Sequence, residues 1–483
     1  MITFMLTPFI ISSLGKTGYG IWTLVGSFTG YYGLVNLGIG SAVTRYVASY
    51  AGQKNGQALN ETAGTALLTF SCTGFFVAFL SFVAAEPLAS YFRVSPAETA
   101  SFVQVVRLLG VATGLSFVAG VYTAVMNAFE LFVLSNIINV VSALIRAGLI
   151  VVLLKSGFGL FGVAVSTLIS IFCSLAACML GCRSLIPEVR FSVLLASRSN
   201  LMVLVRYGLV TTVIVIADIL RSDIDAFVVA RWVSVQDVSI YSVATTLIKL
   251  MVSITTAGMG VLLPRFSMLY GDGDDEKLRK LFLQSISIAS FISFGTAVIA
   301  ILYGGSFIHV WVGKQFFESN FILQILAIST AFAIAQNPGI GFMYALKKHH
   351  YYAVITLCEG IANFLLSIFL AGRFGVLGVA LGTMITMLIS KIFFMPAYVS
   401  RIAGISLGTY WKAIAAPAVV ATSLVGLARI ISFSEIDHPD YFKLILFISF
   451  TALVYMAACL TLMGREERNT IISFFPRFKK QVI

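Results

Sequence analysis

SGFGLFGVAVSTLIS, the stretch Ser156–Ser170, returns 216 residues later as GRFGVLGVALGTMIT, the stretch Gly372–Thr386. Over the thirteen positions that begin at Phe158 and Phe374, seven residues are identical and the others are conservative replacements. A generic apolar composition does not explain this level of identity. We therefore interpret the two stretches as one part of the fold that occurs twice.

The composition identifies the chain as a membrane protein. Apolar residues make up 59% of it and charged residues 11%, and the mean hydropathy is +0.97. A chain this poor in polar side chains cannot coat a water-soluble globule. Apolar runs of roughly 20 residues, the length that crosses a bilayer as a helix, recur along the sequence. We predict fourteen transmembrane spans, at residues 1–12, 18–38, 60–85, 102–126, 132–155, 158–181, 207–231, 238–263, 281–303, 317–344, 350–371, 374–399, 413–432 and 442–463.

The spacing of the two copies predicts how the spans are organised. Six predicted spans separate the copies, so both copies cross the membrane in the same direction and the halves are parallel repeats about an axis along the membrane normal. The predicted fold is an all-α integral membrane protein of about 14 transmembrane helices, with two six-helix lobes and two additional C-terminal helices. The expected divisions are an N-lobe at 1–199, a C-lobe at 200–400, and the extra spans with a basic tail at 401–483.

Lys and Arg gather in alternate loops of this predicted topology. Loops retained in the cytoplasm carry the excess of positive charge, which places both termini inside. The net charge of +12 then reflects topology and attraction to anionic lipid headgroups, and no nucleic-acid binding is expected. The six cysteines and four histidines form no disulfide framework or metal pattern, and no Gly-rich phosphate loop is present. No cofactor is therefore expected.

Polar side chains inside the predicted spans are the candidate substrate-binding residues, because such groups are costly in lipid and usually face the interior of a bundle. Asn136, Asn139 and Arg146 are three and seven residues apart, a spacing that places them on one helical face. Glu359 and Asn363 share a face of the equivalent span in the second half. We predict that these residues line a polar, positively charged cavity.

Three further basic residues have competing interpretations. Lys249 lies inside the predicted span 238–263 and adds positive charge to the candidate site. Arg45, at the inner end of the second span, is equally well explained as a phosphate clamp or as a positive-inside anchor. Arg107 begins near the outer surface and is better explained by a side chain that extends to that surface.

The predicted span 207–231 contains a cluster of charged residues. Asp218, Arg221 and Asp225 share one helical face, and Asp223 lies on another. The three residues form either a structural ion pair or a site for substrate or a coupling ion. Because an unpaired charge that faces lipid is costly, we expect them to lie close together at the interface between the lobes.

The N-terminal residues carry a family resemblance. The segment TPFIISSLGKTGYGIWTLVGSFTGYYGLVNLGIGSAVTRYVASYAGQ, Thr7–Gln53, closely resembles the opening signature of Wzx-type oligosaccharide flippases, in the polysaccharide-export branch of the superfamily that also contains multidrug antiporters and lipid II flippases. IDAFVVARWVSVQDVSIYSVA, Ile224–Ala244, resembles the start of the second lobe in that family. The resemblance covers essentially the whole chain.

This resemblance implies a function. Members carry polyprenyl-pyrophosphate-linked oligosaccharide across the bacterial inner membrane for surface polysaccharide such as O-antigen, and they are not enzymes. The implied partners are the lipid-linked glycan, membrane lipids and the polysaccharide polymerase or ligase machinery, and a monomer is expected. The N-terminus is the exception to the pattern: the first span is short, and aligning Tyr19 with Tyr241 places Met1 opposite Asp223. We expect either a start assigned too late or a truncated first helix.

Three alternatives stay open from the sequence. A multidrug/cation antiporter shares the fold and the repeat, but usually has twelve spans and an acid-rich ion site. A membrane enzyme such as a glycan polymerase or ligase needs a sizeable outer loop with catalytic residues, whereas the outer loops predicted for this chain are short. A channel is disfavoured because two dissimilar lobes do not form a ring of identical pore-lining groups.

Overall fold

The computed structural model describes residues 2–32, 39–206, 216, 219, 224–256, 262–348, 350–430, 440–462 and 468. The secondary structure of these residues is helical, without a β-strand, and ten helices among them are long and apolar enough to cross a membrane. The predicted all-α membrane fold is therefore confirmed. The count of fourteen spans stays a prediction.

The chain divides into two compact units, Met1–Ser239 and Ile240–Ile483. The first unit contains α1 (Ile2–Tyr32), α2 (Ile39–Gly52), α3 (Gly56–Tyr91), α4 (Pro96–Ala128), α5 (Phe132–Lys155), α6 (Gly159–Leu185), η2 (Val193–Leu195) and α8 (Ile224–Trp232). The helix α9 (Val235–Thr256) begins at the end of this unit. The second unit continues with α10 (Leu262–Gly271), α11 (Asp275–Val312), η4 (Lys314–Phe316), α12 (Ser319–Ala335), α13 (Asn337–Ala345), α14 (His350–Ile389), η5 (Ser390–Phe394), α15 (Met395–Ala403), α16 (Leu407–Ile430) and α17 (Tyr441–Leu462).

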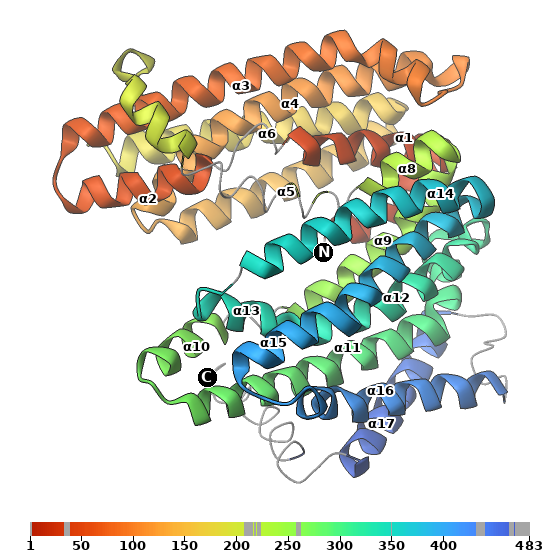
Figure 1. Cartoon of the computed structure of the whole chain (residues 1–483). Helices are drawn as coiled ribbons and strands as arrows, with labels where there is room; N and C mark the ends of the chain where they lie inside the picture. The colour runs from red at the N-terminus through yellow and green to blue at the C-terminus, as the bar shows by residue number, and fades with distance from the viewer. Residues whose placement is uncertain are drawn as a thin grey trace. The chain divides into compact units, whose positions relative to one another are not determined.

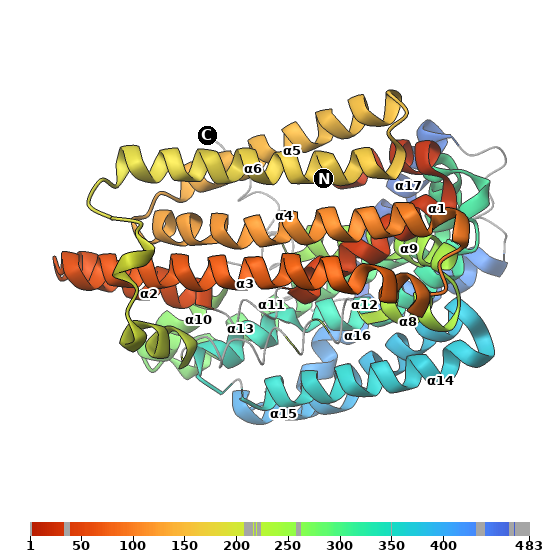
Figure 2. The same ribbon diagram turned by 90° about the horizontal axis from the view of Figure 1, so that it is seen from above.

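In the first unit, the long helices α3, α4 and α6 run beside one another (Figures 1 and 2). Small residues allow α3 and α4 to approach closely: a Cβ atom added to Gly74 would lie 2.5 Å from the carbonyl oxygen of Gly114, and the reverse distance is the same. Such contacts are typical of membrane bundles, where close packing replaces the hydrophobic driving force between helices. Buried side chains such as Val77, Val121 and Val125 fill the remaining core.

In the second unit, α11 is the central helix and contacts α12, α16 and α17. Buried tyrosines fix α17 to it, because the Tyr303 hydroxyl lies 2.6 Å from Thr451 Oγ1 and the Tyr455 hydroxyl donates to the Phe291 carbonyl at 3.0 Å. The two C-terminal helices therefore pack on α11 through specific polar contacts as well as through apolar surface.

The repeated stretch forms a sharp turn between two helices in both units. Gly159 has φ 53° and Gly375, the equivalent residue 216 positions later, has φ 57°. Residues with a Cβ rarely adopt this left-handed region, so the turn requires glycine. Gly375 breaks α14 into two legs, which correspond to the predicted spans 350–371 and 374–399. Gly15, with φ 69°, breaks α1 in the same way between the first two predicted spans.

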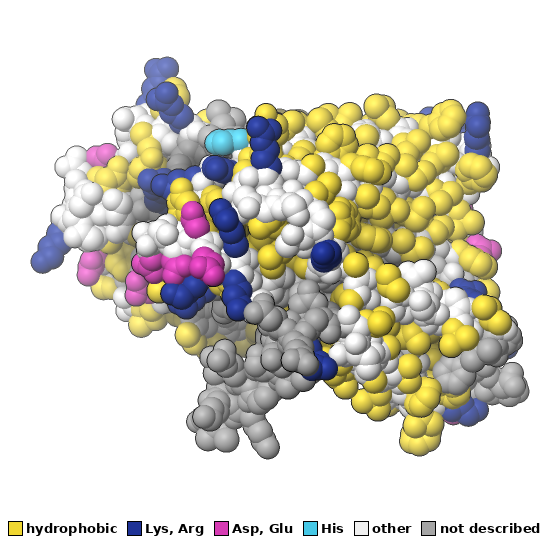
Figure 3. All heavy atoms as spheres, turned by 60° about the horizontal axis from the view of Figure 1, so that its bottom comes forward, with side chains coloured by type: hydrophobic (Ala, Val, Ile, Leu, Met, Phe, Trp, Pro, Cys, Tyr) yellow, Lys and Arg dark blue, Asp and Glu magenta, His cyan; other side chains and the backbone are white. Residues whose placement is uncertain are grey.

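Many large apolar side chains lie on the surface. On α3, for example, Phe75 is 74% exposed and Phe79 is 58% exposed, while Ser81 is buried. Figure 3 shows a broad area of hydrophobic side chains on one face, with the charged side chains gathered mainly toward one end of the view. An apolar exterior over a partly polar interior is the arrangement expected of a helical membrane protein.

Candidate functional site

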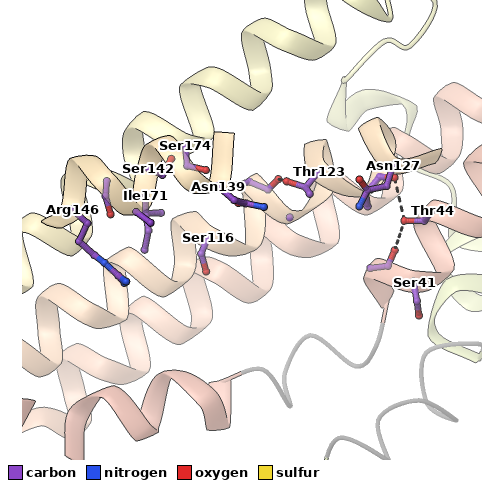
Figure 4. Close-up of a pocket in the computed structure, with 16 residues that line it drawn as sticks. Ser41, Thr44, Ser116, Thr123, Asn127, Asn139, Ser142, Arg146, Ile171 and Ser174 are labelled. Carbon is purple, nitrogen blue, oxygen red and sulfur yellow. Dashed lines mark hydrogen bonds between the residues drawn. The ribbon is translucent and has the colours of Figure 1, made fainter. Parts of the chain in front are cut away.

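A polar cavity of about 620 Å³ lies in the first unit, between α2, α4, α5 and α6 (Figure 4). Small residues make the space, since Gly40, Ala119, Gly120 and Ala143 line it without filling it. The other described lining residues are almost all polar, and no acidic or aromatic side chain is among them. A cavity with this lining suits an anionic or uncharged polar ligand better than a cation.

The helix α5 supplies the charged wall of the cavity. Asn139, Ser142 and Arg146 line it from one face of this helix, as their spacing of three, four and seven residues requires. Arg146 is half-buried, and in Figure 4 its guanidinium extends away from α5 into the space between the helices. Within the part of the chain that the structure describes, this guanidinium forms no hydrogen bond and no ion pair. Its charge is therefore available to a ligand.

The walls formed by α2 and α4 carry hydroxyl groups that already donate hydrogen bonds to backbone carbonyls. On α4, Ser116 donates to the Thr113 carbonyl at 2.7 Å and Thr123 donates to the Ala119 carbonyl at 3.1 Å. On α2, Thr44 donates across to the Ala124 carbonyl of α4 at 3.1 Å. A hydroxyl that gives its proton to a backbone carbonyl keeps its lone pairs, so these walls present hydrogen-bond acceptors to the cavity.

Three other predicted binding residues lie on exposed surface and do not line this cavity. Asn136 is on α5, one turn before Asn139; both side chains are exposed, but only Asn139 lines the cavity. Arg45 is exposed on α2, with its guanidinium 6.0 Å from the ring centroid of Tyr46. Lys249 is exposed on α9. The role predicted for these residues in substrate binding stays a prediction.

Glu359 and Asn363 are buried in the second unit. Glu359 Oε2 forms an ion pair with Lys391 Nζ at 3.1 Å, and the two side chains are 2% and 4% exposed. Asn363 Oδ1 accepts hydrogen bonds from Ser367 of the same leg at 2.9 Å and from Thr383 at 3.2 Å, and the second bond ties the two legs of α14 together. Sequence reasoning missed Lys391. The signal that could have found it was a lone basic residue inside the predicted span that follows the span of Glu359.

The remaining charged candidates divide between described and undescribed residues. Asp218, Arg221 and Asp223 lie outside the described residues, whereas Asp225 is 4% exposed in α8. Arg107 forms an ion pair with Glu86 at 2.9 Å, between α4 and α3, and both side chains reach the surface. Among the described residues, no group of three or more His, Cys, Asp or Glu side chains could hold a metal ion.

Comparisons with known proteins agree with a transport fold. The chain is 24% identical to an uncharacterized membrane protein of Bacillus subtilis, EpsK, over 99% of this chain and 95% of that protein. It is 23% identical to a candidate O-antigen transporter of Shigella flexneri, over 80% of this chain and 90% of that protein.

Solved structures share the fold at low sequence identity. The lipid II flippase MurJ, in an inward closed conformation, matches with a TM-score of 0.72 and 14% identity over 94% of this chain and 98% of that one. An inward-facing multidrug transporter of the MATE family, in the MOP superfamily, matches with a TM-score of 0.71 and 15% identity over 84% and 96%. A family model described as "Polysaccharide biosynthesis protein" matches residues 14–321. The chain therefore belongs to this family of polysaccharide biosynthesis proteins, and the resemblance of its N-terminal residues to the Wzx-type flippases of the superfamily is confirmed.

Proposed function

We propose that this chain is a flippase that moves polyprenyl-pyrophosphate-linked oligosaccharide across the bacterial inner membrane by alternating access, for the synthesis of surface polysaccharide. Membership of the polysaccharide biosynthesis family and the similarity to a candidate O-antigen transporter support this role. The fold shared with a lipid II flippase supports a lipid-linked cargo. These relatives are transport proteins, not enzymes.

The observation that carries the proposal is the Arg146 guanidinium in the wall of a polar cavity whose described lining contains no acidic residue. A pyrophosphate cannot cross hydrocarbon unaided, because each buried charge without a partner is very costly. A guanidinium offers forked, permanently charged donors that match phosphate oxygens. A cavity of this kind lowers the barrier for the headgroup while the polyprenyl chain stays in lipid.

The same cavity disfavours the antiporter alternative. A cationic drug or a coupling cation would need a carboxylate partner, but none of the lining residues that the structure describes is acidic, and Arg146 would repel the cation. The multidrug transporter similarity carries only the fold, and the charge of this site favours an anionic cargo over a cationic one.

The remaining expectations follow from the role. Both termini lie in the cytoplasm, the chain works as a monomer without a cofactor, and the flipped glycan passes to polymerase or ligase machinery. The energy comes from a gradient of substrate, ions or voltage.

The test replaces Arg146 in cells that lack the chromosomal copy and compares surface-glycan assembly at equal protein level. Arg146→Lys keeps the positive charge but loses the paired N–H donors of the guanidinium, so it should retain partial function. Arg146→Gln should reduce glycan assembly at least about tenfold. Arg107→Gln is the matched control, because it removes a guanidinium of the same unit that pairs with Glu86 outside the cavity. If Arg146→Gln assembles glycan like the parent, the cavity is not the path of the headgroup.

A further inference from the structure

The hydrogen-bonding groups of the cavity are unevenly distributed along its length. Figure 4 shows Arg146 at one end and Asn127 with Thr44 at the other, with Asn139 and Thr123 between them. Asn127 contacts Ser135 at the start of α5, and Arg146 follows Ser135 by eleven residues on the same helix. At about 1.5 Å per residue, the backbones of Ser135 and Arg146 are roughly 16 Å apart along the axis of α5, and the Arg146 side chain extends into the space between them.

The two ends offer different chemistry. At the Arg146 end the guanidinium supplies donors only, which suits an anion because phosphate oxygens only accept. At the other end, Thr44 and Thr123 have given their protons to backbone carbonyls, so their oxygens accept. A phosphate would gain nothing from these acceptors. A sugar hydroxyl would, because it both donates and accepts hydrogen bonds.

Asn127 supplies the matching donor at the same end. Its Oδ1 lies 3.0 Å from Ser135 Oγ, which is also 3.0 Å from the Phe132 carbonyl, so the one Ser135 proton is shared between these two acceptors and orients the amide. Its Nδ2 group has no partner within the described residues, although Asn127 lines the cavity. The amide is therefore held with a free N–H donor beside the acceptor oxygens of Thr44 and Thr123.

We propose that Asn127, Thr44 and Thr123 form a hydroxyl-recognition subsite for the sugar next to the pyrophosphate, while Arg146 holds the pyrophosphate itself. This inference rests on the proposed function and adds a polarity to it: the glycan points toward the Asn127 end of the cavity. No aromatic side chain is among the lining residues that the structure describes, so hydrogen bonds are the means by which these residues recognise the sugar. Ser135 acts as a positioning residue, because it touches Asn127 and is not part of the lining.

The experiment compares two probes on the purified full chain by native mass spectrometry: undecaprenyl pyrophosphate, and the same lipid carrying one N-acetylhexosamine. The parent should bind the sugar-bearing lipid about fivefold more tightly, the gain expected from one or two neutral hydrogen bonds. Asn127→Ala should lose this preference and keep its affinity for the bare lipid. Ser135→Ala should lose part of it, because the amide is then free to rotate.

Two controls separate this inference from the proposed function. Thr422→Ala removes a hydroxyl that is bonded to its own helix at 2.8 Å on exposed surface of α16, and should bind both lipids like the parent. Arg146→Gln should weaken both lipids; if it weakens neither, the proposed anion site is wrong. If Arg146→Gln weakens both but Asn127→Ala and Ser135→Ala keep the preference of the parent, or the parent has none, only the sugar subsite is wrong.

Discussion

Lys391 lies in the π-helical turn η5 and places its ammonium in an almost fully buried ion pair with Glu359. The second carboxylate oxygen of Glu359 has no hydrogen-bond partner among the described residues. The side-chain hydroxyl of Ser390, the residue before Lys391, has none among them either. A π-turn interrupts the regular α-helical ladder and often occurs at functional sites. A buried pair of this kind contributes little net stability, but it is very sensitive to the loss of one partner.

We predict that Lys391→Ala destabilises the protein by about 3–5 kcal/mol, because it leaves the Glu359 carboxylate buried without a counter-charge. The double variant Glu359→Gln/Lys391→Met should cost clearly less, since no charge is then left. Thermal unfolding in detergent measures both. If the double variant is as unstable as Lys391→Ala, the charge balance is not the reason for the pair. If it is stable but fails to assemble glycan, Glu359 has a functional role as the sequence analysis predicted.

The residue-scale predictions from the sequence succeeded where one helix was enough to make them. The spacing of Asn139 and Arg146 placed both on one face of α5, and the cavity lies against that face. Periodicity could not tell that Asn136, on the same predicted stripe, does not line the cavity, although Asn136 and Asn139 are both exposed. The partner of Glu359 was out of reach for a different reason: Lys391 is 32 residues away, and only the fold of α14 back on itself brings them together.

Two glycines in α4 have different roles, because one faces a neighbouring helix and the other faces the cavity. Gly114 touches α3, where an added Cβ would lie 2.5 Å from the Gly74 carbonyl oxygen. Gly120, six residues later, lines the cavity and has nothing within 4 Å of an added Cβ. One helix therefore uses glycine both to approach a neighbour and to leave room for a ligand.

Substitutions at Gly114 and Gly120 separate the packing role of the first glycine from the cavity-lining role of the second. Gly114→Ala should lower stability by about 1–3 kcal/mol, because the helices must move apart to admit the methyl group. Gly120→Leu should leave the melting temperature near that of the parent but reduce glycan assembly strongly, because the side chain fills the cavity. Gly120→Ala is the matched control and should keep most of the activity. Full transport by Gly120→Leu would show that the substrate does not pass this part of α4.

The sequence predicted the elements well where glycine or length marks their ends. Both copies of the repeated stretch form the turn that their shared glycine requires, at Gly159 and Gly375. Apolar runs predicted α5, α6 and α17 to within four residues at each end, but the span predicted at 281–303 is six residues short of the start of α11 and nine short of its end. They could not predict that α14 and η5 join through a π-turn, because the geometry of such a turn depends on packing in three dimensions and has no period of its own in the sequence.

The division of the chain into two halves depends on whether α8 is assigned to the first half or to the second. The repeat assigns residues from 200 onward to the C-lobe, whereas the compact unit of the structure continues to Ser239. Aromatic contacts explain this: the ring of Phe227 on α8 lies 5.2 Å from that of Phe92 and 5.9 Å from that of Tyr91, at the end of α3. In addition, the Arg231 guanidinium lies 4.8 Å from the centroid of the Tyr91 ring. These contacts hold α8 against α3.

If the repeat defines the moving lobes, α8 must leave α3 during transport, since a device that alternates between two openings has to separate helices of different lobes. We predict that joining Tyr91→Cys to Phe227→Cys with a bis-methanethiosulfonate cross-linker, in a background without the six native cysteines, stops glycan assembly and that a reductant, which cleaves both mixed disulfides, restores it. Phe70→Cys/Phe117→Cys is the control, because these side chains join α3 to α4 with ring centroids 6.4 Å apart and both helices belong to the predicted N-lobe. Cross-linking this control pair should leave assembly near the level of the parent. Unimpaired glycan assembly by the cross-linked Tyr91→Cys/Phe227→Cys variant would mean that α8 moves with α3. The functional boundary between the lobes would then lie after α8 and not at residue 200.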